Sequence, residues 1–231
     1  MSKLEDLTTL INLKQDMKKL LFLGLFTAST VVSSNANAQA VEEGNILVDV
    51  YAGYGTIFNA LFRTAYIGVD SDSKLTAIDA IGLRAEYLVA DKFGVGLDFT
   101  YSSAKIVDPY TKTVYTYDQN GFVTGSTLTP YEQTFSSKKI GVMVSMNYHF
   151  LDNDKIDAYT NLGVGYKNRS YAYESTNPAE VSEELGVGTV IPLALRVGVG
   201  MRYFFTDNIG INMNVGLGQG GWVNGGLALK F

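Results

Sequence analysis

Eight charged residues share one feature of spacing: each lies on the polar side of a segment in which apolar and polar residues alternate. Side chains two residues apart point to the same face of a strand, so this alternation would gather all eight on one face of a sheet. Arginine and carboxylate groups confined together form strong charge-assisted hydrogen bonds. The set therefore predicts an ion-pair network that fills the interior, with a narrow gated path as the alternative. The residues are Asp49, Arg84, Glu86, Asp98, Asp157, Arg196, Arg202 and Lys230.

Other chemically reactive residues are scarce. The 231-residue sequence has no Cys and a single His, His149. This composition excludes disulfides, Cys-based zinc or iron–sulfur sites and any mechanism that needs two imidazoles. His149 lacks a neighbouring constellation of Ser with Asp or Asn, so we expect a structural side chain. We predict no catalysis, no cofactor and no metal ion, and the net charge of −5 argues against nucleic acid as a partner.

Eight alternating segments are the elements that must position these charges. Each is about 9–13 residues long, the length that a tilted strand needs to cross a bilayer. The face opposite the charged one carries no charge in any of them. The segments are 45–54, 81–89, 93–102, 139–150, 156–167, 193–205, 209–218 and 222–231.

The charge-free face could point into the core of a soluble barrel or outward to lipid. The glycines and the aromatic residues distinguish these two architectures. Many of the 24 glycines lie on the charged face. Glycine weakens an exposed strand of a soluble protein for no gain, whereas inside a small barrel it makes room for large side chains. Tyr148 and Phe150 mark one end of the apolar face, and Tyr54, Tyr101 and Tyr166 the other, as in the aromatic belts of membrane barrels. We predict an all-β fold, an eight-stranded antiparallel up-and-down transmembrane β-barrel.

The N-terminal region has the pattern of an export signal. A basic start at Met17–Lys19 precedes an apolar stretch, and small residues follow with two Ala-x-Ala motifs that end at Ala38 and Ala40. This is typical of a secretory signal peptide, and we favour cleavage after Ala40, with Ala38 second. The predicted segments are a misassigned upstream extension at 1–16, the signal peptide at 17–40 and the barrel at 41–231.

Long and short connections alternate between the predicted strands. Barrels of the outer membrane have short periplasmic turns and longer extracellular loops, so both termini are expected in the periplasm. The last outer connection, 219–221, is the exception, because it is very short. The predicted extracellular loops are about 55–80, 103–138 and 168–192.

The second loop contains a hairpin signal of its own. Asn120 and Gly121 lie between two runs rich in Thr, Tyr and Val. Asn-Gly in this setting favours a type I′ turn, so the flanking strands could continue beyond the membrane. A protruding sheet edge can bind a strand from a partner.

The C-terminus resembles the β-signal that is read by the barrel assembly machinery. That signal runs polar, any, Gly, any, any, hydrophobic, any, aromatic, and Asn224, Gly226, Leu229 and Phe231 occupy its defined places. Residues of about 44–231 resemble in pattern the small eight-stranded outer-membrane barrels, which include OmpX, the OmpA transmembrane domain and the opacity-type proteins. OmpW-type barrels are the nearest alternative.

This resemblance implies an integral outer-membrane protein of a Gram-negative cell, surrounded by lipid and lipopolysaccharide. It implies a structural and surface-interaction role, in which loops bind a host or surface protein, without catalysis. The alternative is a narrow OmpW-like channel for small apolar solutes. Arg–carboxylate pairs across the lumen would favour the closed barrel, and a continuous bore would favour the channel.

Overall fold

The computed structural model describes residues 40–56, 72–151, 153–185 and 191–231. The chain divides into two units, Ala38–Lys230, which holds the described strands, and Met1–Asn37 with Phe231. The predicted upstream extension, most of the signal peptide including Ala38, and most of the first loop lie outside the described residues. Within the described part of the chain, no helix is long and apolar enough to cross a membrane.

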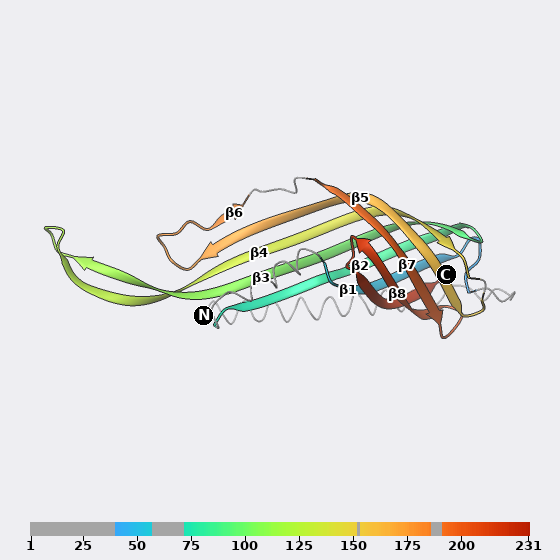
Figure 1. Cartoon of the computed structure of the whole chain (residues 1–231), viewed down its shortest axis with the longest axis horizontal. Coiled ribbons are helices and arrows are strands. Elements are labelled where there is room, and N and C mark those ends of the chain that lie inside the picture. Colours follow the sequence, from blue (N-terminus) through green and yellow to red (C-terminus); the bar gives the residue numbers. More distant parts are fainter. Residues whose placement is uncertain (1–39, 57–71, 152, 186–190) are drawn as a thin grey trace. The chain divides into compact units, whose positions relative to one another are not determined.

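Nine strands make up the fold of the described residues (Figure 1). They are β1 (Ile46–Tyr54), β2 (Lys74–Ala90), β3 (Phe93–Tyr117), β4 (Val123–His149), β5 (Ile156–Ser175), β6 (Glu183–Leu185), β7 (Leu193–Phe204), β8 (Ile209–Gly218) and β9 (Val223–Lys230). Eight of these strands pair as antiparallel neighbours in the order β1, β2, β3, β4, β5, β7, β8, β9, and β9 pairs with β1 to close the ring. The predicted eight-stranded up-and-down barrel is confirmed.

The period of two residues decides which side chains point inward. Leu47, Asp49 and Tyr51 of β1 are buried, and the residues between them face outward. The same alternation holds around the ring, and the outward face is lined by large apolar side chains. Soluble proteins rarely expose a continuous apolar surface of this kind, whereas transmembrane barrels present one to lipid. The wall therefore has its apolar face toward lipid and its charges inside.

Four strands are longer than predicted, so the predicted loops are shorter. β2 begins at Lys74, β5 ends at Ser175, and β3 and β4 occupy most of 103–138. β3 and β4 stay paired as far as Tyr117↔Val123 and continue together beyond β2 and β5 (Figure 1). The strand-forming residues continue there, but the sorting of apolar and polar faces stops, because lipid no longer imposes it. Alternation alone therefore ended the strands too early, whereas the hairpin signal at Asn120 and Gly121 correctly indicated that β3 and β4 continue.

The turn that joins β3 to β4 differs from the predicted type I′ turn. The Asp118 N–H donates to the Phe122 carbonyl at 2.9 Å, and the Gly121 N–H donates to the Asp118 carbonyl at 3.1 Å. Gly121 adopts a positive φ of 82°. This pattern is a three-residue loop in which a residue in the left-handed conformation follows the turn. The Asp118 carboxylate stabilises it by accepting from the N–H groups of Asn120 and Phe122.

The ninth strand, β6, was not predicted. It pairs with Tyr171–Tyr173 on the extended part of β5, outside the ring, in a segment expected to be loop. Three residues are too short for an alternation to be visible in the sequence. The segment 168–192 is therefore partly an extension of the sheet.

Substitution by Arg can distinguish the part of β4 that lies in lipid from the part that extends beyond the membrane. Val144 and Leu128 both point outward from β4, with exposed fractions of 52% and 70%, but only Val144 lies within the ring. An Arg at the bilayer midplane costs about 2–4 kcal/mol. We expect Val144→Arg to lose that much in the free energy of unfolding in lipid bilayers, measured by urea titration. Leu128→Arg should change it by less than about 0.5 kcal/mol. Equal losses would contradict the position of the membrane.

Candidate functional site

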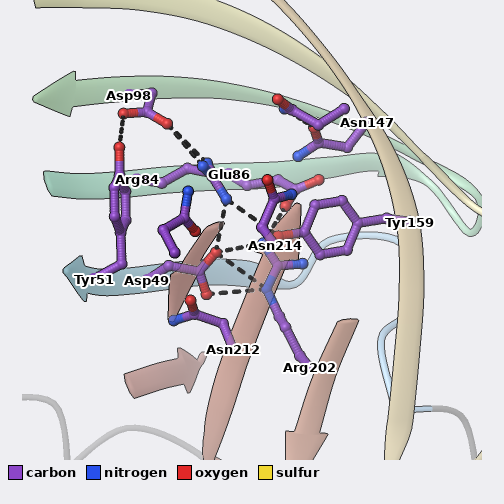
Figure 2. A network of polar contacts seen from close by, with 12 residues as sticks. Asp49, Tyr51, Arg84, Glu86, Asp98, Asn147, Tyr159, Arg202, Asn212 and Asn214 are labelled. Carbon is purple, nitrogen blue, oxygen red and sulfur yellow. Dashed lines mark hydrogen bonds and ion pairs between the residues drawn. The ribbon is translucent and has the colours of Figure 1, made fainter. Parts of the chain in front are cut away.

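The barrel interior holds a network of charges centred on Arg202 of β7 (Figure 2). The guanidinium contacts one carboxylate from each of three other strands. Its Nη2 lies 2.8 Å from Asp49 Oδ2 and 2.8 Å from Glu86 Oε2. Its Nη1 lies 2.8 Å from Asp157 Oδ2. Arg202 and all three carboxylates are fully buried or nearly so. One side chain thus joins β1, β2, β5 and β7 across the lumen.

A second arginine, Arg84 of β2, extends the network. Its Nε donates to Asp98 Oδ2 at 3.0 Å, and its Nη1 lies 3.5 Å from Asp49 Oδ2. The hydroxyl of Tyr51 donates to the other oxygen of Asp98 at 2.6 Å. Asp49 therefore connects the two arginines, and each of the four inner carboxylates has at least one cationic partner.

His149 completes this group at the end of β4. Its Nδ1 lies 2.6 Å from Asp157 Oδ1, and its Nε2 lies 2.9 Å from Glu86 Oε1. A catalytic His needs one nitrogen free to accept a proton from a nucleophile. Here both nitrogens are held by carboxylates, so the geometry gives His149 a structural role. Among the described residues, no group of three or more acidic, His or Cys side chains could hold a metal ion.

Inward glycines provide the room for two large tyrosines. The Tyr159 ring lies 4.4 Å from the Arg202 Cζ atom, and its hydroxyl accepts from Arg84 Nη1 at 3.1 Å. Gly200 is the cross-strand partner of Tyr159, and a Cβ atom at Gly200 would collide with the ring. Tyr51 lies over Gly82 in the same way. These contacts match the role that the sequence indicated for the inner glycines.

The end of the lumen opposite the chain termini is closed by the turn Gln219–Gly221, which we call the outer plug. The Gln219 side chain is buried, and its amide donates to Thr100 Oγ1 across the lumen. A Cβ atom at Gly141 would collide with this amide. Arg196 supports the plug from β7 by donating to the carbonyls of Gln219 and Gly221 and to the side chain of Asn214.

Two residues of the predicted network therefore lie apart from it. Arg196 contacts carbonyl and amide oxygens in the outer plug and forms no ion pair with the carboxylates of the described residues. Lys230 lies at the terminal end, where its Nζ donates to the Ala40 carbonyl at 2.8 Å and lies 5.2 Å from the centre of the Phe204 ring. Alternation identifies the inward face, but it does not identify the height at which a side chain meets its partner.

The terminal end of the lumen is also covered. Ala40 and Val41, which we call the terminal cap, are buried among inward apolar residues of four strands. The Ala40 N–H donates to the Asn153 carbonyl at 2.7 Å. The cap packs against Leu47, Leu88, Phe204 and Ala228.

The residues of the predicted assembly signal lie in β9, apart from Phe231. Asn224 points inward, and its amide donates to the Gly220 carbonyl of the outer plug at 3.4 Å. Gly226 pairs with Tyr51, and a Cβ atom there would collide with the Val50 carbonyl. Leu229 pairs with Val48 of β1. Their role in assembly stays a prediction, as does cleavage at Ala38 or Ala40.

Sequence reasoning did not assign Tyr51, Tyr159 and Gln219 to the polar interior. It expected His149 to be a structural side chain, but it did not predict the contacts of His149 with two carboxylates. Tyr51, Tyr159 and His149 lie on the inward positions of their strands, so the alternation could have placed them beside the charges. Gln219 belongs to a turn, where no alternation applies. Its only signal is the unusual shortness of the last outer connection.

Several solved structures are similar to this chain, among them two from Pseudomonas aeruginosa and one from Yersinia pestis. The N-terminal β-barrel domain of Pseudomonas aeruginosa OprF is 14% identical, with a TM-score of 0.41 over 83% of this chain and 100% of that chain. The outer membrane protein OprG from Pseudomonas aeruginosa is 13% identical, with a TM-score of 0.43 over 84% and 99%. Ail, the attachment invasion locus protein of Yersinia pestis, in complex with the heparin analogue sucrose octasulfate, is 14% identical, with a TM-score of 0.35 over 82% and 99%. No family model and no curated protein matches the sequence.

The network can be tested by a matched pair of substitutions on β7. Arg202→Met leaves three buried carboxylates without their shared cation, and removing one partner of a buried pair costs about 3–5 kcal/mol. Arg196→Met leaves only neutral acceptors unpaired, so we expect a smaller loss of about 1–2 kcal/mol. The measurement is urea unfolding of the refolded barrel in bilayers. Adding Asp49→Asn to Arg202→Met should recover part of the loss, and equal losses for the two single variants would contradict the network.

Proposed function

We propose that this chain is an integral outer-membrane barrel with a closed lumen, which serves as a rigid base for an extracellular sheet that binds a surface partner. The observation that carries the proposal is the set of contacts between Arg202 and carboxylates of β1, β2 and β5. An eight-stranded barrel has an interior about filled by its side chains. Charged pairs that cross such an interior occupy the volume that a solute would need.

Closure is supported at three heights of the lumen. Val41, joined by Ala40 where the cut is after Ala38, covers one end with apolar packing. The arginine network fills the middle, and the outer plug covers the other end. A solute passing through would have to break buried ion pairs, which is costly. The alternative, a narrow channel for small apolar solutes, needs a continuous bore past all three.

The extended hairpin is the part of the chain best placed to meet a partner. Beyond Asp108 on β3 and Glu132 on β4, the hairpin has no strand neighbour on either side within the described residues. Its tip exposes Phe122 and Leu128, with exposed fractions of 71% and 70%. Free strand edges can pair with an added strand, and exposed apolar side chains supply contact area.

A hydrogen-bonded knot fixes the base of this hairpin. Glu180, in the third loop, accepts from the hydroxyls of Ser175, Tyr110 and Tyr173 at 2.8, 2.8 and 2.9 Å. These hydrogen bonds lower the pKa of Glu180 to about 2, so the carboxylate stays ionised at any physiological pH. The knot joins the third loop to β3 and β5, which supports a preformed binding surface.

We place the short turns and both ends of the barrel in the periplasm and the hairpin outside the cell. The apolar wall is then surrounded by outer-membrane lipid and lipopolysaccharide, and β9 carries the signal for the barrel assembly machinery. The partner is a host or surface protein. The engagement of both His149 nitrogens supports a role without catalysis.

Planar-bilayer recording tests the closed lumen. We expect the refolded chain to insert without producing steady or stepwise current, because no water-filled path crosses the charge network. A heat-modifiability gel on the same proteoliposomes shows that the protein is folded and present. Current steps whose number rises with the amount of folded protein would contradict closure and favour the narrow channel.

Binding by the hairpin can be tested on intact cells that display the protein. Phe122→Lys with Leu128→Lys removes the exposed apolar contacts of the tip, so we expect several-fold fewer cells to bind a monolayer of host cells. Ser126→Lys with Thr127→Lys adds the same charge to the same hairpin and should bind like the unmodified protein. No adhesion by the unmodified protein, or equal adhesion by both variants, would contradict this role.

A further inference from the structure

A group of cations lies on the inner face just outside the outer plug. Lys139 of β4 is the direct cross-strand partner of Arg169 of β5, and Lys167 is the partner of Gly141, over which Gln219 lies. All three cations occupy the inward positions of their strands. Like charges directly opposite each other destabilise a sheet, so this arrangement needs a compensating contact.

Lys139 receives no such contact from the residues that the structure describes. Its exposed fraction is only 9%, and no ion pair or hydrogen bond joins its ammonium to the described residues. Arg169 and Lys167 act on its ammonium as like charges and repel it. A charge on a mostly buried side chain that lies among like charges is normally paired with an opposite charge. Lys139 therefore lies among like charges without an opposite charge from the described residues.

Two carboxylates farther out on this sheet are occupied by other donors. Asp108 accepts from the Ser73 hydroxyl at 2.5 Å and from the Gln133 amide at 2.7 Å. Glu180 is held in the knot at the base of the hairpin. The four carboxylates of the central network are paired on the opposite side of the outer plug.

The neighbours of the cations are small and polar. Ser102 is the cross-strand partner of Lys139 on β3, and Ser137 accepts from Arg169 Nη1 at 3.1 Å. Ammonium, guanidinium and hydroxyl donors together match the acceptor oxygens of a tetrahedral oxyanion. The outer plug separates this site from the terminal side of the lumen, so a ligand would enter from the extracellular side.

We propose that Lys139, Lys167 and Arg169 form a binding site for a phosphate or sulfate group carried by a soluble molecule. The site faces the inside of the barrel, which distinguishes it from contacts with lipid headgroups on the outer wall. Binding supplies the missing counter-charge for Lys139. This function is additional to hairpin binding and does not depend on whether the barrel conducts.

The test is the thermal unfolding of the refolded full-length barrel in phosphatidylcholine vesicles, titrated with sodium phosphate or sodium sulfate against sodium chloride at equal ionic strength. We expect a saturable rise in the unfolding midpoint with the oxyanions alone. Lys139→Gln should weaken the apparent affinity at least about tenfold, since a hydrogen bond to a charged group is lost. Without added oxyanion, this variant should be no less stable than the unmodified protein, because it loses a charge that Arg169 and Lys167 repel.

Lys138→Gln is the matched control. Lys138 is the adjacent residue on β4 and points outward, so its loss should leave the response to phosphate unchanged. Lys167→Gln provides a second variant that should weaken binding if the site is shared by the cations. The proposal is overturned if phosphate and chloride act alike, if Lys139→Gln responds as the unmodified protein does, or if stabilisation requires phosphatidylglycerol in the bilayer instead of free phosphate.

Discussion

The pairing of buried charges inside a ring of eight strands is the constraint on which the rest of this structure depends. Its interior is too narrow for bulk water, so each charge placed there must find a partner across the lumen. Arg202 forms ion pairs with three carboxylates at once. One of them, Asp49, also forms an ion pair with Arg84. The inward glycines, the stacked tyrosines and the position of His149 all follow from accommodating these two large cations.

The sequence predicted the wall of the barrel well, because lipid and a filled lumen impose opposite demands on alternate residues. Val144 and Ser145 could be assigned to opposite faces from their neighbours alone, and the structure has them so. The charges of the central network could be assigned to the interior by the same logic. Their pairing could not, since Arg196 and Lys230 share the inward face with Arg202 but lie nearer the two ends of the lumen.

Outside the membrane, the alternation of apolar and polar residues no longer marks the strands. Water surrounds both faces of the extended hairpin, so Thr, Tyr and Val form strands there without a regular alternation, and the predicted loop 103–138 is mostly strand. Turns show the same limit. Gln219 reaches across the lumen from a connection of a few residues, and a single Asn-Gly pair was compatible with more than one turn geometry. The hydrogen bonds of Asp118 select the one observed.

The terminal cap lies at the two predicted processing sites. Ala40 and Val41 cover the lumen just after the predicted site at Ala38, and the Ala40 carbonyl accepts from the Lys230 ammonium of the last strand. A peptidase cut after Ala38 leaves this contact intact. A cut after Ala40 would remove it and create a new ammonium on Val41, in an apolar pocket close to Lys230. The position of the cut therefore decides the contacts where the first and last strands meet. A cut after Ala38 keeps the cap, and a cut after Ala40 leaves two repelling charges there.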